Sequence, residues 1–185
     1  MLLPRVFASS IALVASLRSR VVTTTCSAAN MGSMPSPVLD EKGAVLNAEA
    51  LAGKRVALYF SAGWCPMCTS IEPAMMTFLQ ACEDSGKPIS LIYVPSDRNQ
   101  ADAQSRAQGL NALQVPFDQA DEYKKQFKIW AGSECMRLGL GRRSGVPALV
   151  VLGSDCKELA FLPAEAQGVR ALQQWPLDDP RGVWP

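Results

Sequence analysis

The sequence predicts an α/β protein in which a central mixed β-sheet is flanked by helices on both faces. Three short, mostly apolar runs, at residues 56–60, 89–94 and 146–152, are typical of strands buried on both sides. Segments with helical spacing of apolar residues separate these runs, and such alternation favours parallel neighbours in the sheet. A fourth run, at residues 158–162, follows a short Gly-Ser-Asp turn and therefore adds an antiparallel strand.

The first half of the chain contains a short hairpin or edge strand, then a buried strand and a long helix. Residues 38–46 are predicted to form the hairpin because apolar pairs flank a glycine there. The long helix is expected to begin near Pro66 and to end at Gly86, with a kink at Pro73. Its apolar side chains form one stripe at helical spacing: Cys68, Ile71, Met75, Phe78, Leu79 and Cys82.

The second half of the chain contains three further helical segments by the same criteria. Residues 99–112 are polar with weak helical character, and residues 121–127 form a short amphipathic pattern. Residues 164–175 are predicted to close the chain as a helix. No element is assigned to residues 128–141, where several apolar side chains lie among glycines.

The composition limits the classes of function. A chain of 185 residues suffices for one domain and a tail, and a net charge of +1 gives no electrostatic case for nucleic acid. The absence of histidine excludes Ser-His-Asp and Cys-His catalysis, as well as histidine-ligated zinc or haem. No run of 18 apolar residues is present, so no membrane-spanning helix is expected. We expect a monomer.

The N-terminal segment has the composition of a targeting sequence. Residues 1–33 are rich in Ser, Ala, Thr and Val and contain no acidic residue. Their basic residues are Arg5, Arg18 and Arg20. This composition is typical of organelle import presequences, with a secretory signal or an untargeted segment as alternatives. We therefore expect a presequence at 1–33, the folded domain at 34–178 and a tail at 179–185. The expected location is the mitochondrion; a plastid is an alternative, as is the cytoplasm or nucleus if translation starts at Met31.

The motif that carries the chemistry is Trp64-Cys65-Pro66-Met67-Cys68, at the junction of the first buried strand and the long helix. Two cysteines separated by two residues on a first helical turn can close a disulfide. Cys65 would face the unpaired N–H groups and the positive dipole end that stabilise a thiolate. Pro66 suits the first turn because it has no N–H. The motif predicts that Cys65 attacks a substrate disulfide and that Cys68, deeper and protonated, resolves the mixed disulfide.

A structural zinc site is the alternative interpretation of the cysteine pair. Zinc takes four ligands, and without histidine the other two would have to be cysteines. The remaining cysteines are Cys26, Cys82, Cys135 and Cys156, and no two of them lie at metal-binding spacing. A redox site is therefore favoured and no metal is expected. Core packing is the expected role of Cys82, since it continues the apolar stripe of the helix.

Residues 57–68, Ala-Leu-Tyr-Phe-Ser-Ala-Gly-Trp-Cys-Pro-Met-Cys, closely resemble the active-site segment of tryparedoxins and nucleoredoxins, a branch of the thioredoxin superfamily. The segments at 95–98, 115–118 and 144–151 are also similar to segments of that family and occur in the same order. The resemblance implies a thioredoxin-like fold and the reduction of protein disulfides by Cys65 and Cys68.

The chain departs from the family pattern in four places. The family usually has a second proline between the cysteines, where this chain has Met67, and an arginine just after them, where it has Thr69. A tryptophan common before the segment at 115–118 is replaced by Ala112. Residues 128–141 resemble an insertion relative to short family members. These departures bear on the reduction potential, the reductant and the substrate rather than on the dithiol chemistry.

The resemblance also implies partners. No cofactor would be bound, and the Cys65–Cys68 disulfide would be reduced by an external system. That system would be a flavoprotein reductase with NADPH or a low-molecular-weight thiol. The clients would be disulfide-containing proteins such as peroxiredoxins. The alternative, also drawn from the nucleoredoxins, is a redox-sensitive binding protein with little turnover.

Two supporting residues follow from the resemblance. Pro147 would be the cis-proline that faces the disulfide, and the backbone of Val146 would pair with the client chain like an added strand. Trp64 either shields the thiols and contacts partners or caps the core, and the first is preferred.

Four further residues have both a functional and a structural interpretation. Tyr59 occupies the position of a buried acid in thioredoxins, so it is either a weak proton-transfer group or a core aromatic residue. Glu72 is either a proton acceptor or a solvated residue. Arg142 and Arg143 either favour the thiolate or are surface charges, and the second is preferred.

Overall fold

The computed structural model describes residues 38–40, 43–46, 51, 54–153 and 157–178. The predicted presequence at 1–33, the tail at 179–185, and the cysteines Cys26 and Cys156 lie outside these residues. Among the described residues, no helix has the length and apolar character needed to cross a membrane.

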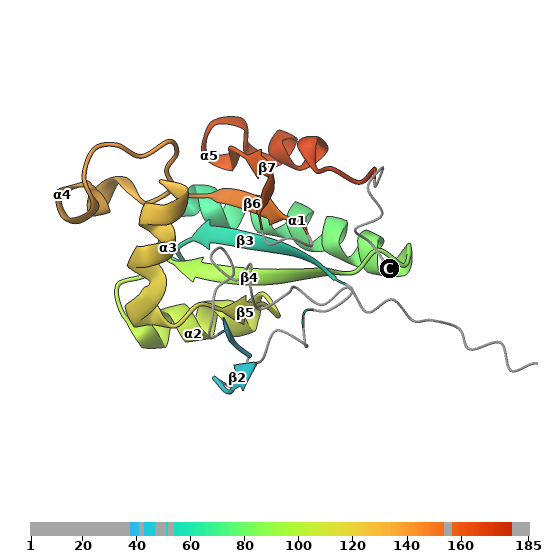
Figure 1. Cartoon of the computed structure of the whole chain (residues 1–185), viewed down its shortest axis with the longest axis horizontal. Helices are drawn as coiled ribbons and strands as arrows, with labels where there is room; N and C mark the ends of the chain where they lie inside the picture. The colour runs from blue at the N-terminus through green and yellow to red at the C-terminus, as the bar shows by residue number, and fades with distance from the viewer. Residues whose placement is uncertain (1–37, 41–42, 47–50, 52–53, 154–156, 179–185) are drawn as a thin grey trace, which may run out of the picture.

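A seven-stranded mixed sheet forms the centre of the molecule, in the order β2-β1-β5-β4-β3-β6-β7 (Figure 1). The central strand β3 (Arg55–Ser61) pairs in parallel with β4 (Ile89–Pro95) and antiparallel with β6 (Ala148–Leu152). On one side β6 pairs antiparallel with β7 (Glu158–Leu162). On the other side lie three two-residue strands: β5 (Leu113–Gln114), β1 (Val38–Leu39) and β2 (Val45–Leu46). The predicted mixed sheet is therefore confirmed.

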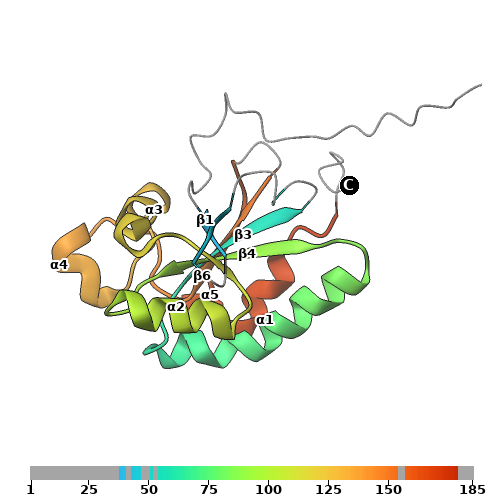
Figure 2. The ribbon, with the colours of Figure 1, turned by 90° about the horizontal axis from the view of Figure 1, so that it is seen from below.

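Helices cover both faces of the sheet, as predicted (Figure 2). One face packs against α1 (Pro66–Asp84), α2 (Gln100–Gly109), α5 (Ala164–Gln167) and the 3₁₀ helix η5 (Gly168–Gln174). The other face packs against α3 (Ala120–Phe127), which follows a short 3₁₀ turn, η3 (Phe117–Gln119). The sheet therefore lies in the middle of three layers.

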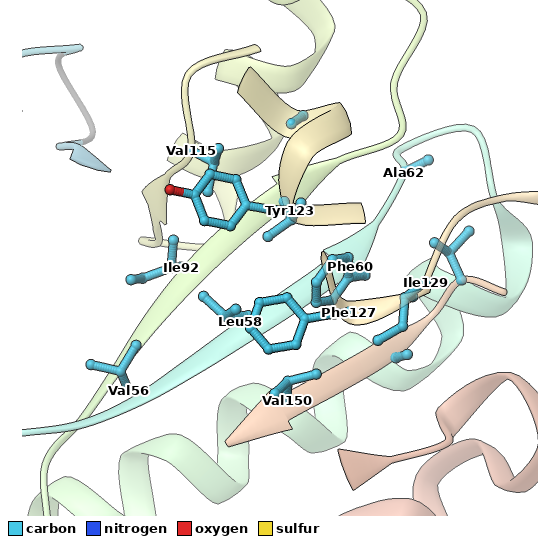
Figure 3. Packing of buried hydrophobic residues seen from close by; sticks show 14 of the residues in the cluster. Val56, Leu58, Phe60, Ala62, Ile92, Val115, Tyr123, Phe127, Ile129 and Val150 are labelled. Carbon is cyan, nitrogen blue, oxygen red and sulfur yellow. The ribbon is translucent and has the colours of Figure 1, made fainter. Parts of the chain in front are cut away.

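Every residue of β3 is buried, and its side chains alternate between the two cores. Leu58 and Phe60 point toward α3, where the Phe60 ring lies 5.9 Å from the ring of Phe127 in an edge arrangement (Figure 3). Ala57 and Tyr59 point toward α1. Burial on both faces explains why this strand appears in the sequence as a continuous apolar run.

The ends of two predicted elements differ from the structure. The strand predicted at 146–152 begins at Ala148, because Pro147 has no N–H to donate to a ladder. The helix predicted at 164–175 is divided: α5 ends at Gln167, its C-cap Gly168 has a φ of +55° in the left-handed region, and the chain continues as η5. A third element, α1, runs through Pro73 and stops at Asp84, two residues before the predicted end at Gly86.

The segment that received no predicted element leaves the sheet between α3 and β6. A bridge between Ile129 and Ser144 closes it at its base. It contains a 3₁₀ turn, η4 (Gly132–Glu134), and a single helical turn, α4 (Cys135–Leu138). Both ribbon views place α4 beyond α3 at the end of the molecule (Figures 1 and 2). We call residues 130–143 the excursion.

Candidate active site

The two cysteines of the motif lie at the junction of β3 and α1. Cys65 is the N-cap residue of α1, with extended backbone, and Pro66 occupies the first helical position. The Cys65 sulfur accepts a hydrogen bond from the backbone N–H of Cys68 at 3.3 Å. This donor and the positive end of the helix dipole both stabilise negative charge on that sulfur. Both residues are buried, with 6% of Cys65 and 0% of Cys68 exposed.

The environment of Cys68 differs from that of Cys65. Burial raises the pKa of the Cys68 thiol, and its hydrogen bond with Cys65 raises it further. Cys68 therefore keeps its proton at neutral pH. The Cys65 sulfur is therefore the outer one of the pair, and the protonated Cys68 thiol lies beneath it.

The segment before β6 lies against the outer sulfur. The Val146–Pro147 peptide bond is cis, as expected. The Cys65 sulfur lies 3.8 Å from the Val146 carbonyl oxygen, to which its S–H donates a weak hydrogen bond. The structure thus brings Val146 and Pro147 to the motif although they lie about eighty positions later in the chain.

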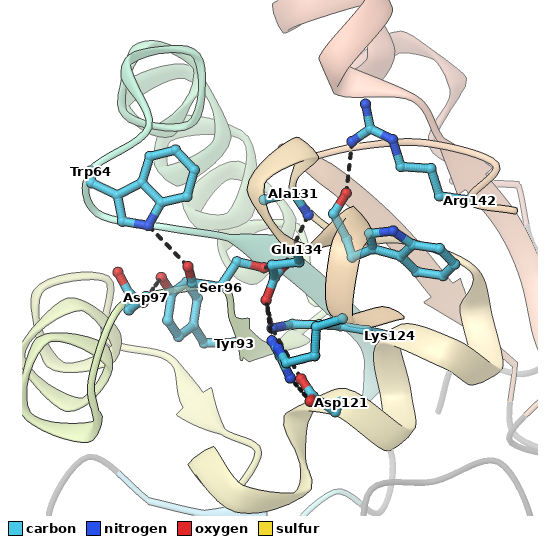
Figure 4. A network of polar contacts seen from close by, with 11 residues as sticks. Trp64, Tyr93, Ser96, Asp97, Asp121, Lys124, Ala131, Glu134 and Arg142 are labelled. Atoms are coloured by element: carbon cyan, nitrogen blue, oxygen red, sulfur yellow. Dashed lines mark hydrogen bonds and ion pairs between the residues drawn. The ribbon is translucent and has the colours of Figure 1, made fainter. Parts of the chain in front are cut away.

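Trp64 is fixed by the loop that follows β4. Its Nε1 donates to the Ser96 carbonyl oxygen at 2.9 Å, and 42% of the residue stays exposed (Figure 4). The preceding Gly63 N–H donates to Asp97 Oδ1 at 2.7 Å, and Tyr93 Oη donates to Asp97 Oδ2 at 2.5 Å. Met67 is the other exposed apolar residue of the motif. Trp64 and Met67 therefore present apolar surface beside a nearly enclosed thiol.

A buried polar group lies behind Cys68. The Tyr59 hydroxyl is placed to donate to the Cys68 carbonyl oxygen at 3.2 Å or to Glu72 Oε1 at 3.3 Å. Burial raises the pKa of Tyr59, so its phenol stays neutral. Glu72 is 7% exposed and forms an ion pair with Arg106 of α2. Glu72 is thus a paired interior carboxylate rather than a solvated one, and sequence analysis missed Arg106 because it belongs to a weakly patterned helix.

The remaining candidates lie away from the thiols. Arg143 makes a two-pronged ion pair with Glu158, at 2.9 and 2.8 Å, and Arg142 Nη1 donates to the Trp130 carbonyl oxygen at 2.8 Å. These contacts favour the structural interpretation of both arginines. Cys82 is buried in α1, in keeping with its expected core role, and Cys135 is half-buried in α4. Within the described ranges, no group of three or more metal-ligating side chains is assembled.

These features define a thioredoxin-like dithiol site, and comparisons with known proteins give the family. A family model described as thioredoxin-like matches residues 53–158, which is more than half of the chain. The chain belongs to this family.

The chain is also similar to two groups of known proteins. Mouse nucleoredoxin is 30% identical over 117 residues, covering 63% of this chain and 24% of its own length. Tryparedoxin from Trypanosoma brucei brucei is 26% identical over 142 residues, covering 74% of this chain and 83% of the relative. The structure of tryparedoxin I from Crithidia fasciculata covers 80% of this chain and 97% of its own, with a TM-score of 0.59 and 23% identity, which supports the fold. The matched region thus spans about a quarter of the length of mouse nucleoredoxin and most of the length of the tryparedoxin.

Proposed function

We propose that this protein reduces disulfide bonds in client proteins through Cys65 and Cys68. The observation that carries the proposal is the asymmetry of the pair. The Cys65 sulfur caps α1 and accepts a backbone N–H, whereas the Cys68 thiol is fully buried one turn below. When a dithiol reduces a disulfide, one sulfur attacks and the other resolves the mixed disulfide, and this asymmetry fits that division.

The reaction proceeds in two exchanges. The Cys65 thiolate attacks one sulfur of the client disulfide; a mixed disulfide forms and the other client sulfur leaves as a thiolate. Cys68 then loses its proton and attacks the Cys65 sulfur, which releases the second client thiolate. Two electrons pass to the client, two protons accompany them at neutral pH, and the protein is left with a Cys65–Cys68 disulfide. Since burial raises the pKa of Cys68, its deprotonation is coupled to the second step.

The client chain would pair with the backbone at Val146, beside the cis-proline Pro147, in the manner of an added strand. The 3.8 Å separation between the Cys65 sulfur and the Val146 oxygen supports this arrangement, because a paired client cysteine would then face the nucleophile. Trp64 and Met67 would supply apolar contacts on either side, and Pro66 occupies the first helical position, next to Met67.

The partners follow from the tryparedoxin resemblance. Peroxiredoxins are the proposed clients, and either a flavoprotein reductase using NADPH or a low-molecular-weight thiol is the proposed reductant. We propose a monomer without a bound cofactor, located in the mitochondrion through residues 1–33, with the plastid or cytosol as alternatives. A fluorescent reporter fused to residues 1–33 tests the location: organelle import supports it, and cytosolic fluorescence contradicts it.

Trapping experiments test the reductase mechanism. Cys68→Ser should accumulate covalent client adducts on Cys65, visible on non-reducing gels, because the resolving thiol is missing. Cys65→Ser should trap nothing, and Cys135→Ser, which removes a half-buried thiol of α4, is the matched control that should behave as wild type. Equal trapping by the two active-site variants would refute the assigned roles. Client binding without turnover by the wild-type protein would instead support the regulatory binding function.

A further inference from the structure

The excursion is anchored to the active-site loop by one carboxylate. Glu134 Oε2 accepts hydrogen bonds from Ser96 Oγ at 2.8 Å and from the Ala131 N–H at 2.9 Å. Its Oε1 accepts from Lys124 Nζ at 2.6 Å and from Arg137 Nη2 at 3.0 Å (Figure 4). The Lys124 side chain is only 3% exposed, so this ion pair is internal. The excursion therefore has a fixed place beside the loop after β4.

Ser96 joins this anchor to the motif. Its side chain is bound to Glu134, and its carbonyl oxygen accepts the indole N–H of Trp64, the residue next to Cys65. The chain of contacts thus runs from the excursion to the edge of the dithiol site within two hydrogen bonds of 2.8 and 2.9 Å.

A cleft of about 320 Å³ lies between the motif and the excursion. We call it the Trp64–Arg137 cleft. Trp64, Asp97 and Arg98 line it on the motif side, and Glu134 and Arg137 line it on the excursion side. Its volume is at the lower end for small-ligand pockets, which suits one or two side chains of an extended polypeptide.

The charges that line the cleft differ in whether they are already occupied. Both oxygens of Asp97 accept hydrogen bonds within the protein, and so do both oxygens of Glu134. Arg137 faces Asp121 and Glu134. Within the part of the chain that the structure describes, Arg98 is exposed and has no hydrogen bond, ion pair or ring contact. Among the charged groups that line the cleft, the one left free to bind a ligand is therefore a cation, the Arg98 guanidinium.

We propose that the Trp64–Arg137 cleft is a specificity subsite that takes an acidic side chain of the client, close in sequence to the attacked cysteine. The Arg98 guanidinium binds the carboxylate, because its planar array of donors matches two carboxylate oxygens. The Trp64 ring covers the apolar stem of the same side chain. The inference rests on the proposed disulfide reduction, for which it names a preference among clients.

Peptide disulfides that differ at one position provide the test. A cysteine-containing peptide in mixed disulfide with a neutral fluorophore carries Glu, Gln or Lys, placed in turn at each of three positions on either side of the cysteine. The pre-reduced protein is mixed with each peptide, and single-turnover release of the fluorophore is followed. Affinities for the same peptides with a non-reducible thioether in place of the disulfide are measured separately by calorimetry.

At one position, Glu should be preferred to Lys by about fivefold in rate and in affinity, and high salt should reduce this ratio. Arg98→Gln should abolish the preference and Arg98→Glu should invert it. The ratio between peptides makes the result independent of any general loss of activity in these variants. Lys125→Glu is the matched control: it makes the same change of charge at an exposed position of α3 outside the cleft and should keep the wild-type ratio.

The two measurements separate the subsite from the reductase function. Equal affinities for the Glu, Gln and Lys analogues, or a preference unchanged in Arg98→Glu, would overturn the subsite. Failure to release the fluorophore from any peptide would overturn the reductase function, while the affinities would still decide the subsite. If Lys125→Glu inverted the preference for Glu over Lys as strongly as Arg98→Glu, the subsite would also be overturned, because the general charge of the protein would then be responsible.

Discussion

The dithiol motif and the excursion lie on either side of the Trp64–Arg137 cleft but are built in different ways. The motif is local: a strand, a loop and a helix follow one another, and the capping bond joins residues three positions apart. The excursion is joined to the loop after β4 through the Glu134 carboxylate, whose partners Lys124 and Ser96 lie 10 and 38 positions away. The two thiols at this end of the sheet are therefore placed by consecutive residues, whereas the surroundings of the thiols depend on distant ones.

The largest effect should come from the motif. Cys65→Ser should lower disulfide reduction at least about a thousandfold, because a hydroxyl cannot replace the attacking thiolate. Its far-UV circular dichroism should match wild type, since the substitution is nearly isosteric. Turnover with a neutral disulfide measures the loss. Cys135→Ser, the thiol of the excursion, should retain full turnover, and a comparable loss there would remove the distinction between the two regions.

The anchor of the excursion should affect stability more than chemistry. Glu134→Ala leaves Lys124 charged and buried, so the free energy of unfolding should fall by about 3 kcal/mol. Urea denaturation measures this change. Arg143→Ala, which breaks the half-exposed pair with Glu158, is the matched control and should cost less than about 1 kcal/mol. Similar losses in both variants would mean that the Glu134 pair is not internal.

The buried thiol makes the stability of the reduced protein depend on pH. The pKa of Cys68 is raised in the folded state, so its stabilising contribution is complete below the unfolded pKa of about 8.5 and is lost as pH rises above it. The loss approaches about 1.4 kcal/mol per pH unit. Urea denaturation at pH 7 and 9.5 measures this loss of stability. It should be smaller for Cys68→Ser and for the oxidised protein than for the reduced wild-type protein. An equal loss in all three would contradict the assignment to Cys68.

The smallest effect should be at Tyr59. Tyr59→Phe removes the hydroxyl that faces Cys68 and Glu72, and should cost about 1 kcal/mol of stability. If the hydroxyl also assists deprotonation of Cys68, the variant should resolve the mixed disulfide more slowly, with a changed pH dependence of that rate on the alkaline side. The rate of attack by Cys65 should be unchanged. Stopped-flow measurement of the two steps separates them. An unchanged profile would leave Tyr59 with the core role alone.

Prediction from sequence succeeded where one stretch of chain contains the whole signal. The apolar run of β3 and the stripe of α1 each follow from their own residues, and the motif sits between them. Strand β5 was missed because two residues cannot display a period. The pairing of Glu72 with Arg106, and of Glu134 with Ser96, joins residues 34 and 38 positions apart, so no local pattern could reveal either contact.

Arg143 has a consequence for behaviour in concentrated solution. Strand β7 is an edge of the sheet, where unpaired backbone groups can accept a strand from another molecule. The Arg143 guanidinium lies 4.0 Å from the centre of the Phe161 ring on that strand and is bound to Glu158 beside it. It therefore places charge on an edge that would otherwise present an aromatic surface to other copies of the chain. Loss of this side chain would leave the folded chain almost as stable as before, yet lower the concentration at which it begins to aggregate.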